Sequence, residues 1–203
     1  MIKVGITGGI GSGKTTVCKI FETLSVPVYY ADLRAKILME EDVSLVSAII
    51  NEFGDEAYKD QKLNRGFLSK AVFSDKEKLK KLNQIVHPVV AKDSEKWLNE
   101  NKDASYTIKE AALIMQTGSH EQLDFVILVV APEEVRIKRV MERDKVDRQQ
   151  VIDRMNNQWS EAEMSHFADF SIVNDGEQMI IPQILQLHEI FNQLSKNNLD
   201  EKA

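Results

Sequence analysis

Short apolar runs alternate along the chain with longer stretches in which apolar residues recur every three or four positions. The apolar or β-branched runs predict five strands, at Ile2–Thr7, Val26–Tyr30, Ser105–Glu110, Phe125–Ala131 and Phe170–Val173. Because the runs are apolar at nearly every position, we expect helices to cover both faces of the strands. Strands that alternate with helices indicate parallel βαβ units, and therefore an α/β fold.

The first helix is expected to begin near Gly13. Its apolar residues follow the spacing i, i+3, i+4, i+7, which predicts one buried stripe made of Val17, Ile20, Phe21 and Leu24. Cys18 lies off this stripe, so we expect it to be a structural or half-exposed residue.

Two long stretches lack strand patterns. Residues 33–104 are too many for a simple connection between a strand and a helix, and helices are expected there at Asp42–Phe53, Arg65–Phe73 and Lys76–Ile85. Residues 133–164 form a second helical stretch, which is rich in arginine. We therefore expect a helical insertion at 33–104 within one domain, and a separate helical region at 133–164.

Composition narrows the class of protein. The chain has 203 residues, 43% of them hydrophobic and 29% charged, with a net charge of −6, which is typical of a globular domain and argues against a protein that coats nucleic acid. One cysteine allows no disulfide within the chain and no cysteine-based zinc site. No signal peptide is expected, and the longest apolar run is far shorter than the roughly 20 residues of a membrane span. We expect a cytoplasmic monomer with no membrane or nucleic-acid partner.

Residues 8–15 match the pattern G-x-x-x-x-G-K-(S/T), directly after the first predicted strand and before the first predicted helix. Glycines let such a loop wrap around phosphate oxygens, and the helix N-terminus attracts the same anion. Lys14 is expected to reach the β- and γ-phosphates, and the Thr15 hydroxyl to ligate Mg²⁺. The ATP-binding residues predicted here are Gly8, Gly9, Gly11, Ser12, Gly13, Lys14, Thr15 and Thr16.

Loops with this pattern occur in several classes of protein. A GTPase switch needs a D-x-x-G segment and an N-K-x-D segment, and neither is present. A motor or large ATPase usually needs a longer chain. A small-molecule kinase needs a region that binds the acceptor and an arginine-rich lid that excludes water, and the two helical stretches are suited to these roles.

With these motifs in place, the sequence resembles the dephospho-CoA kinase family over essentially its whole length. The resemblance rests on the opening VGITGGIGSGKTT, on Tyr30-Ala31-Asp32, on Leu63-Asn64-Arg65, on LNQIVHP at 82–88, on KEAALI at 109–114, and on Arg139, Arg143, Arg154, Gln158 and Asn174. Gln116 and Asn64 depart from it, because the family usually has Glu and Asp there.

The resemblance implies a three-layer P-loop kinase fold with a five-stranded parallel sheet flanked by helices. It implies that ATP phosphorylates the ribose 3′-hydroxyl of dephospho-CoA, giving coenzyme A and ADP, with Mg²⁺ as cofactor. Residues 33–104 would then bind the acceptor, and residues 133–164 would form the lid.

Two carboxylates are candidates for chemistry. Asp32 follows the second strand, where it could accept the proton of an attacking hydroxyl or orient that hydroxyl, or else cap the helix expected from Leu33. Glu110 ends the third strand and could hold a water bound to Mg²⁺, or be a surface charge.

Arginines on one predicted helical face are the next candidates. Arg139 is expected to contact the nucleotide phosphates, Arg143 is a weaker candidate and Arg136 is interpreted as peripheral; a solvated face is the alternative for all three. Arg65 could anchor an acceptor phosphate. His87 could contact the substrate or form a structural turn at a helix start, and Asn174 could bind the adenine.

Two alternatives to a dephospho-CoA kinase stay open on the sequence. The chain could phosphorylate another small acceptor such as a nucleoside monophosphate, or it could be a nucleotide-binding regulator that hydrolyses ATP slowly.

Overall fold

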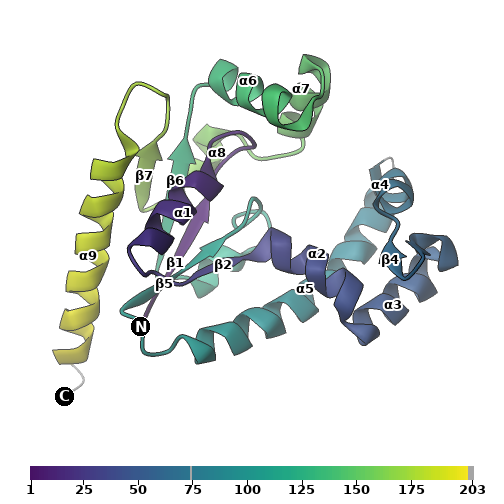
Figure 1. The fold of residues 1–203 in the computed structure, drawn as a ribbon, viewed down its shortest axis with the longest axis horizontal. Helices are drawn as coiled ribbons and strands as arrows, with labels where there is room; N and C mark the ends of the chain where they lie inside the picture. The colour runs from purple at the N-terminus through teal and green to yellow at the C-terminus, as the bar shows by residue number, and fades with distance from the viewer. Residues whose placement is uncertain (74, 201–203) are drawn as a thin grey trace. The chain divides into compact units, whose positions relative to one another are not determined.

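The computed structural model describes residues 1–73 and 75–200 and divides the chain into two compact units (Figure 1). The first unit consists of Met1–Tyr30 and Asn101–Ala203, and the second of Ala31–Glu100. Each unit has a hydrophobic cluster of its own.

The first unit contains a five-stranded sheet in the order β2-β5-β1-β6-β7, in which every neighbouring pair is parallel. The strands are β1 (Ile2–Thr7), β2 (Val28–Tyr30), β5 (Tyr106–Glu110), β6 (Phe125–Val130) and β7 (Phe170–Val173). All five predicted strands are confirmed, with small differences at their ends. β2 begins two residues late because the amide of Val26 bonds to the carbonyl of Phe21 in the turn after the first helix, and Pro27 has no N–H to donate.

Helices cover both faces of this sheet. Its helices are α1 (Lys14–Thr23), α6 (Glu133–Asp144), α7 (Arg148–Asn156), α8 (Glu161–Ser165) and α9 (Ile180–Asp200), with a 3-10 turn η2 at Ser119–Gln122. Alternate residues of β6 enter different clusters: Ile127 joins the one that contains α1 and α9 residues, and Leu128 joins the one that contains Met164 of α8. The predicted α/β fold with a flanked parallel sheet is confirmed, and its three layers follow from this alternation.

The predicted stripe of α1 is only partly right. Val17 and Phe21 are fully buried, whereas Ile20 and Leu24 are partly buried against the same cluster. Cys18 is completely buried, which agrees with the structural alternative of the prediction and excludes the half-exposed one. The cause is that α1 packs against both the sheet and α9, which widens its buried face beyond the stripe.

The second unit is mostly helical and surrounds a cluster that includes Leu45, Ile49 and Val86. Its elements are α2 (Ala31–Glu41), α3 (Val43–Phe53), η1 (Asp55–Ala57), β3 (Tyr58–Lys59), β4 (Lys62–Leu63), α4 (Arg65–Phe73) and α5 (Lys76–Glu100). The predicted helices at Asp42–Phe53 and Arg65–Phe73 are confirmed, and Asp42 is the cap of α3, with a carboxylate that accepts from the amide of Leu45.

Two features of this unit differ from expectation. α5 continues far beyond Ile85 and contains His87 and Pro88 in its middle, so the predicted helix start at Pro88 is wrong. A proline removes one hydrogen bond of a helix, but Val86, Val89 and Val90 pack on the cluster around that turn and keep the helix continuous. The short hairpin of β3 and β4 was not predicted.

Among the described residues, no helix is both long and apolar enough to cross a membrane.

Candidate functional site

The loop of residues 8–13 joins β1 to α1 at the carboxyl end of the central strand, where ligands of open parallel sheets gather. Gly13 is the residue that caps α1, with φ of 95°, and it has no side chain that could bond to the amides of the first helical turn. Those amides and the positive end of the helix dipole are therefore suited to an anion. The local structure agrees with a phosphate-binding loop.

Lys14 folds back over this loop. Its Nζ donates to the carbonyl oxygen of Gly8 at 2.7 Å and to that of Gly9 at 3.4 Å. The ammonium group is thus held at the start of the loop. Thr15 and Thr16 follow in the first turn of α1, and both are exposed.

Asn174 joins the end of β7 to the loop. Its Nδ2 donates to the carbonyl oxygen of Ser12 at 2.8 Å, and a Cβ built on Gly13 would collide with that same nitrogen. The Nη1 of Arg139 donates to the main-chain oxygen of Asn174 at 2.9 Å, and its Nη2 to the side-chain oxygen at 3.4 Å. Arg139, Asn174 and the loop therefore form one connected polar network.

Gln158 also bonds to the loop. Its Oε1 accepts from the amide of Ile10 at 2.8 Å, and Ile10 packs against the cluster that contains Ile137 and Val140 of α6. The sequence pattern identified Gln158 only through the family resemblance and gave it no contact.

Arg136 lies directly against the loop, which contradicts its interpretation as peripheral. A Cβ built on Gly9 would collide with Nη1 of Arg136 and would lie 3.2 Å from its Cζ. A Cβ built on Gly11 would lie 2.5 Å from the main-chain oxygen of Arg136. α6 thus approaches the loop through both the backbone and the side chain of this residue.

Glu110 is the last residue of β5, where it is opposite Ile6 of β1 and Tyr30 of β2. It is buried at the carboxyl end of the sheet, so it is not a surface charge. Burial raises the pKa of the Cys18 thiol, and the negative charge of Glu110 raises it further. No group of three or more His, Cys, Asp or Glu in the described part of the chain could hold a metal ion.

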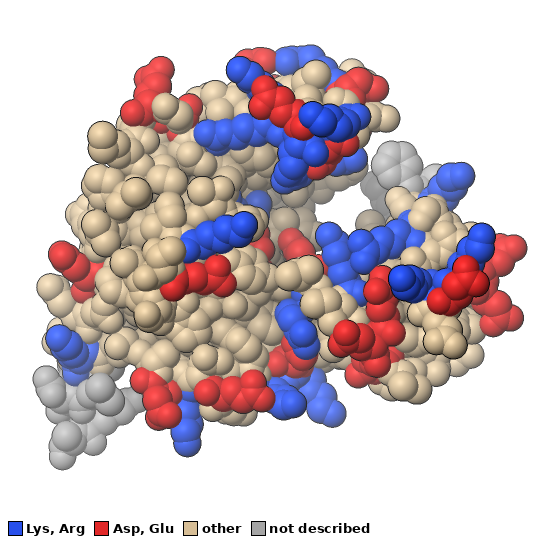
Figure 2. Space-filling model, viewed as in Figure 1, with Lys and Arg blue, Asp and Glu red and all other residues tan. Residues whose placement is uncertain are grey.

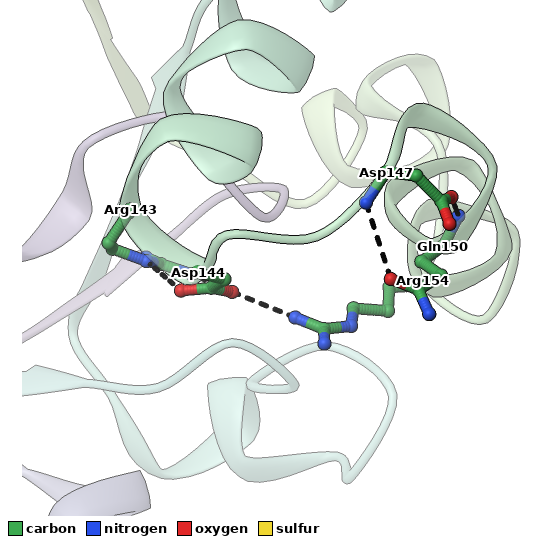
Figure 3. Close-up of polar contacts among 5 residues, drawn as sticks. All are labelled: Arg143, Asp144, Asp147, Gln150 and Arg154. Carbon is green, nitrogen blue, oxygen red and sulfur yellow. Dashed lines mark hydrogen bonds and ion pairs between the residues drawn. The ribbon is translucent and has the colours of Figure 1, made fainter.

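The helices α6 and α7 are joined by an ionic network around Asp144 (Figure 3). Arg143 Nε donates to Oδ1 of Asp144 at 2.7 Å, and Arg154 Nη1 donates to Oδ2 at 2.8 Å. The hydrogen bond from Arg143 is the main cause that lowers the pKa of Asp144, and Arg154 lowers it further. Asp147 then caps α7 in a reciprocal arrangement with Gln150.

A second ion pair links the same two helices, between Arg148 and Glu134 at 2.6 Å. Figure 2 shows basic and acidic side chains intermixed over α6 and α7. The positive charge of the arginine-rich stretch is therefore partly neutralised, since several of its guanidinium groups form ion pairs with carboxylates.

Three predicted site residues lie in the second unit. Asp32 is exposed in the first turn of α2, one residue after the helix begins at Ala31, so it is not the residue that caps this helix. Arg65 is the first residue of α4 and pairs with Glu40 at 3.2 Å. His87 is exposed in the middle of α5.

A glycine-rich loop that leads from the central strand of a parallel sheet into a helix, with a lysine folded over it, defines a P-loop nucleotide-binding protein. The family model for dephospho-CoA kinase matches residues 2–179, so this chain belongs to the dephospho-CoA kinase family. The resemblance seen in the sequence motifs is confirmed.

Individual relatives and solved structures are similar to this chain over most of its length. A dephospho-CoA kinase of Salinibacter ruber is 44% identical over 179 residues, which cover 87% of this chain and 90% of the relative. A crystal structure of TT1252 from Thermus thermophilus has a TM-score of 0.79 at 32% identity and covers 100% of this chain and 98% of its own. A dephospho-CoA kinase structure from Campylobacter jejuni has a TM-score of 0.67 at 28% identity, with coverage of 97% and 98%.

Proposed function

We propose that this protein catalyses the last step of coenzyme A biosynthesis, in which ATP phosphorylates the ribose 3′-hydroxyl of dephospho-CoA. The observation that carries the proposal is the phosphate-binding loop at the carboxyl edge of the sheet, in a chain that belongs to the dephospho-CoA kinase family. The products are coenzyme A and ADP.

ATP is the phosphoryl donor in this proposal. The amides of residues 8–16 surround its phosphates, and Lys14 moves its ammonium group from the loop carbonyls to the β- and γ-phosphates. Arg139 then neutralises the charge that spreads over the transferring group, because its planar guanidinium can meet two oxygens at once. Asn174 is proposed to contact the nucleotide, a role supported by the position of its side-chain nitrogen beside Gly13.

Mg²⁺ is the proposed cofactor. The hydroxyl of Thr15 is an oxygen ligand of the kind that Mg²⁺ prefers, and the ion keeps several waters, one of which the carboxylate of Glu110 would hold. Glu110 is buried at the end of the strand next to β1, which suits a role through a bound water. Bound there, the ion would supply positive charge to the phosphate oxygens.

The second unit supplies the acceptor side of the proposal. Asp32 accepts the proton of the 3′-hydroxyl as the new O–P bond forms and the bond between the γ-phosphorus and the bridging oxygen breaks. Arg65 and His87 are proposed to contact the acceptor. Residues 33–104 form the acceptor-binding region and residues 133–164 the lid, in a protein that acts as a cytoplasmic monomer.

ADP release with Mg²⁺ and ATP tests the function, with dephospho-CoA, AMP, CMP or no acceptor added. We expect release that depends on dephospho-CoA, with one phosphate added per acceptor. Stimulation by a nucleoside monophosphate alone would identify a different kinase, and release that no acceptor stimulates would identify an ATP-hydrolysing regulator. Size-exclusion chromatography with light scattering tests whether the protein is a monomer in solution.

A further inference from the structure

Arg136 differs from every other arginine in the part of the chain that the structure describes. The other six each have a carboxylate or carbonyl partner: Arg34, Arg65, Arg139, Arg143, Arg148 and Arg154. Within residues 1–73 and 75–200, the guanidinium of Arg136 has no ion pair, and its Nε is buried without a hydrogen-bond partner. A half-buried cation without a partner is unfavourable unless a ligand completes its surroundings.

The position of this guanidinium points to the ligand. Its Nη1 occupies the space that a side chain on Gly9 would need. Gly9 stands at a position of the loop pattern that does not require glycine, and its φ is not positive, so its backbone does not require glycine either. The lack of a side chain at Gly9 instead makes room for Arg136.

A second cation is held at the same residue. Lys14 Nζ donates to the carbonyl oxygen of Gly9 at 3.4 Å as well as to that of Gly8. Two side chains with positive charge therefore approach the same residue of an anion-binding loop, and together they favour an anionic ligand there. The loop is the proposed binding site of the ATP phosphates. The β- and γ-phosphates are proposed to bind beside Lys14.

We propose that Arg136, seated over Gly9, is a direct ligand of the terminal phosphates of the nucleotide. The inference rests on the proposed use of ATP, but it does not depend on the identity of the acceptor. Arg136 and Arg139 are three residues apart on α6, so one helix carries both arginines toward the phosphates while only Arg139 is also bonded to Asn174.

Calorimetric titration of the full chain with ATP, ADP and AMP, in EDTA and without acceptor, tests this directly. Arg136→Gln should weaken ATP binding roughly 10–100-fold, the loss expected for charged hydrogen bonds, with a smaller loss for ADP and none for AMP. Arg136→Lys should restore part of the affinity. Lys138→Gln, which removes one charge from an exposed position of the same helix, is the control and should leave all three affinities unchanged.

Gly9→Ala provides a second test that leaves Arg136 in the chain. The atoms that the new methyl group meets are the far end of a flexible side chain, so the protein should fold with nearly unchanged Tm while the guanidinium is displaced. ATP binding should weaken, and the alanine should add little further loss in the Arg136→Gln background.

ATP affinity within twofold of wild type in folded Arg136→Gln would overturn the proposal. Equal losses for ATP and AMP would also overturn it, since they would indicate a purely structural role. Additive losses in the double variant would contradict the seating over Gly9. Because no acceptor is present, a failure of dephospho-CoA phosphorylation would count against the proposed function and leave these binding results intact.

Discussion

The side-chain amide of Asn174 donates to the main-chain oxygen of Ser12 at 2.8 Å and so ties the end of the last strand to the phosphate-binding loop across 162 residues of sequence. The same residue accepts from Arg139 through its main-chain oxygen. One asparagine therefore positions both the loop and an arginine proposed to act on the transferring phosphate.

Replacing Asn174 by alanine should destabilise the protein and weaken ATP binding. The Ser12 carbonyl loses its partner, which should lower the free energy of unfolding by about 1–3 kcal/mol, or the Tm by roughly 2–10 °C for a chain of this size. Thermal melts and ATP titration measure the two effects. Ser171→Ala, at an exposed position of β7, is the control. A variant with unchanged Tm and ATP affinity would show that this hydrogen bond is dispensable.

Arg139→Ala should lower kcat by roughly 10³–10⁵-fold, the range found for arginines that stabilise phosphoryl transfer. Arg139→Lys should retain part of the activity, because it keeps the charge but not the planar fork. The measurement is kcat at saturating substrates, beside a melting curve. Lys138→Ala on the same helix should behave as wild type, and wild-type kcat in Arg139→Ala would rule out a contact with the reacting phosphate.

Lys14→Ala should lower kcat by about 10²–10³-fold, because one charged donor to the developing phosphate charge is lost. The fold should survive, since the loop carbonyls that Lys14 now contacts can bond to water instead. Lys19→Ala, exposed on the same helix, is the matched control. Near-normal turnover with unchanged ATP affinity would contradict the role of the loop lysine.

Asp32→Asn should lower kcat by about 10²–10⁴-fold without unfolding the protein. The side chain is exposed and nearly isosteric with asparagine, so stability should change little. Asp42→Ala is the opposite control: it removes the true cap of α3 and should lower stability by about 0.5–2 kcal/mol while leaving kcat unchanged. Full kcat in Asp32→Asn would show that Asp32 is not the base that accepts the proton of the acceptor hydroxyl.

The Asp144 network predicts a pH-dependent contribution to stability. Hydrogen bonds from Arg143 and Arg154 lower the pKa of Asp144 in the folded state below its unfolded value of about 3.9. The stabilisation is therefore present above that pH and is lost as the pH falls through the folded pKa. Asp144→Asn should melt below wild type at pH 7, and the two Tm values should converge below about pH 4. A constant difference down to pH 3 would contradict this origin.

The sheet could be predicted from the sequence because its strands are runs of mainly apolar or β-branched residues, a signal that depends only on local residues. The loop could be predicted because its chemistry needs particular residue types at fixed spacing. Both signals are contained within a few consecutive positions, and the strands and the loop lie where the sequence predicts them.

The features that the sequence did not predict depend on contacts between distant segments or on a turn without its usual residues. Nothing near Arg136 in the chain shows that its guanidinium lies over Gly9, and nothing near Gln158 shows that it accepts from Ile10. The turn between β3 and β4 uses Asp60 and Gln61, both with positive φ, where a glycine would have given a clear signal.

The one cysteine of the chain lies on α1, completely buried in the main hydrophobic cluster of the first unit, and burial raises the pKa of its thiol. A thiol-specific reagent should therefore not react with the folded protein, because neither access nor thiolate is available. The natural sequence can consequently serve unchanged as the background for site-directed spin labelling. Lys138→Cys and Lys92→Cys, both at exposed positions, would place one nitroxide on each unit. Pulsed dipolar spectroscopy could then follow the separation of the two units as ATP and the acceptor bind.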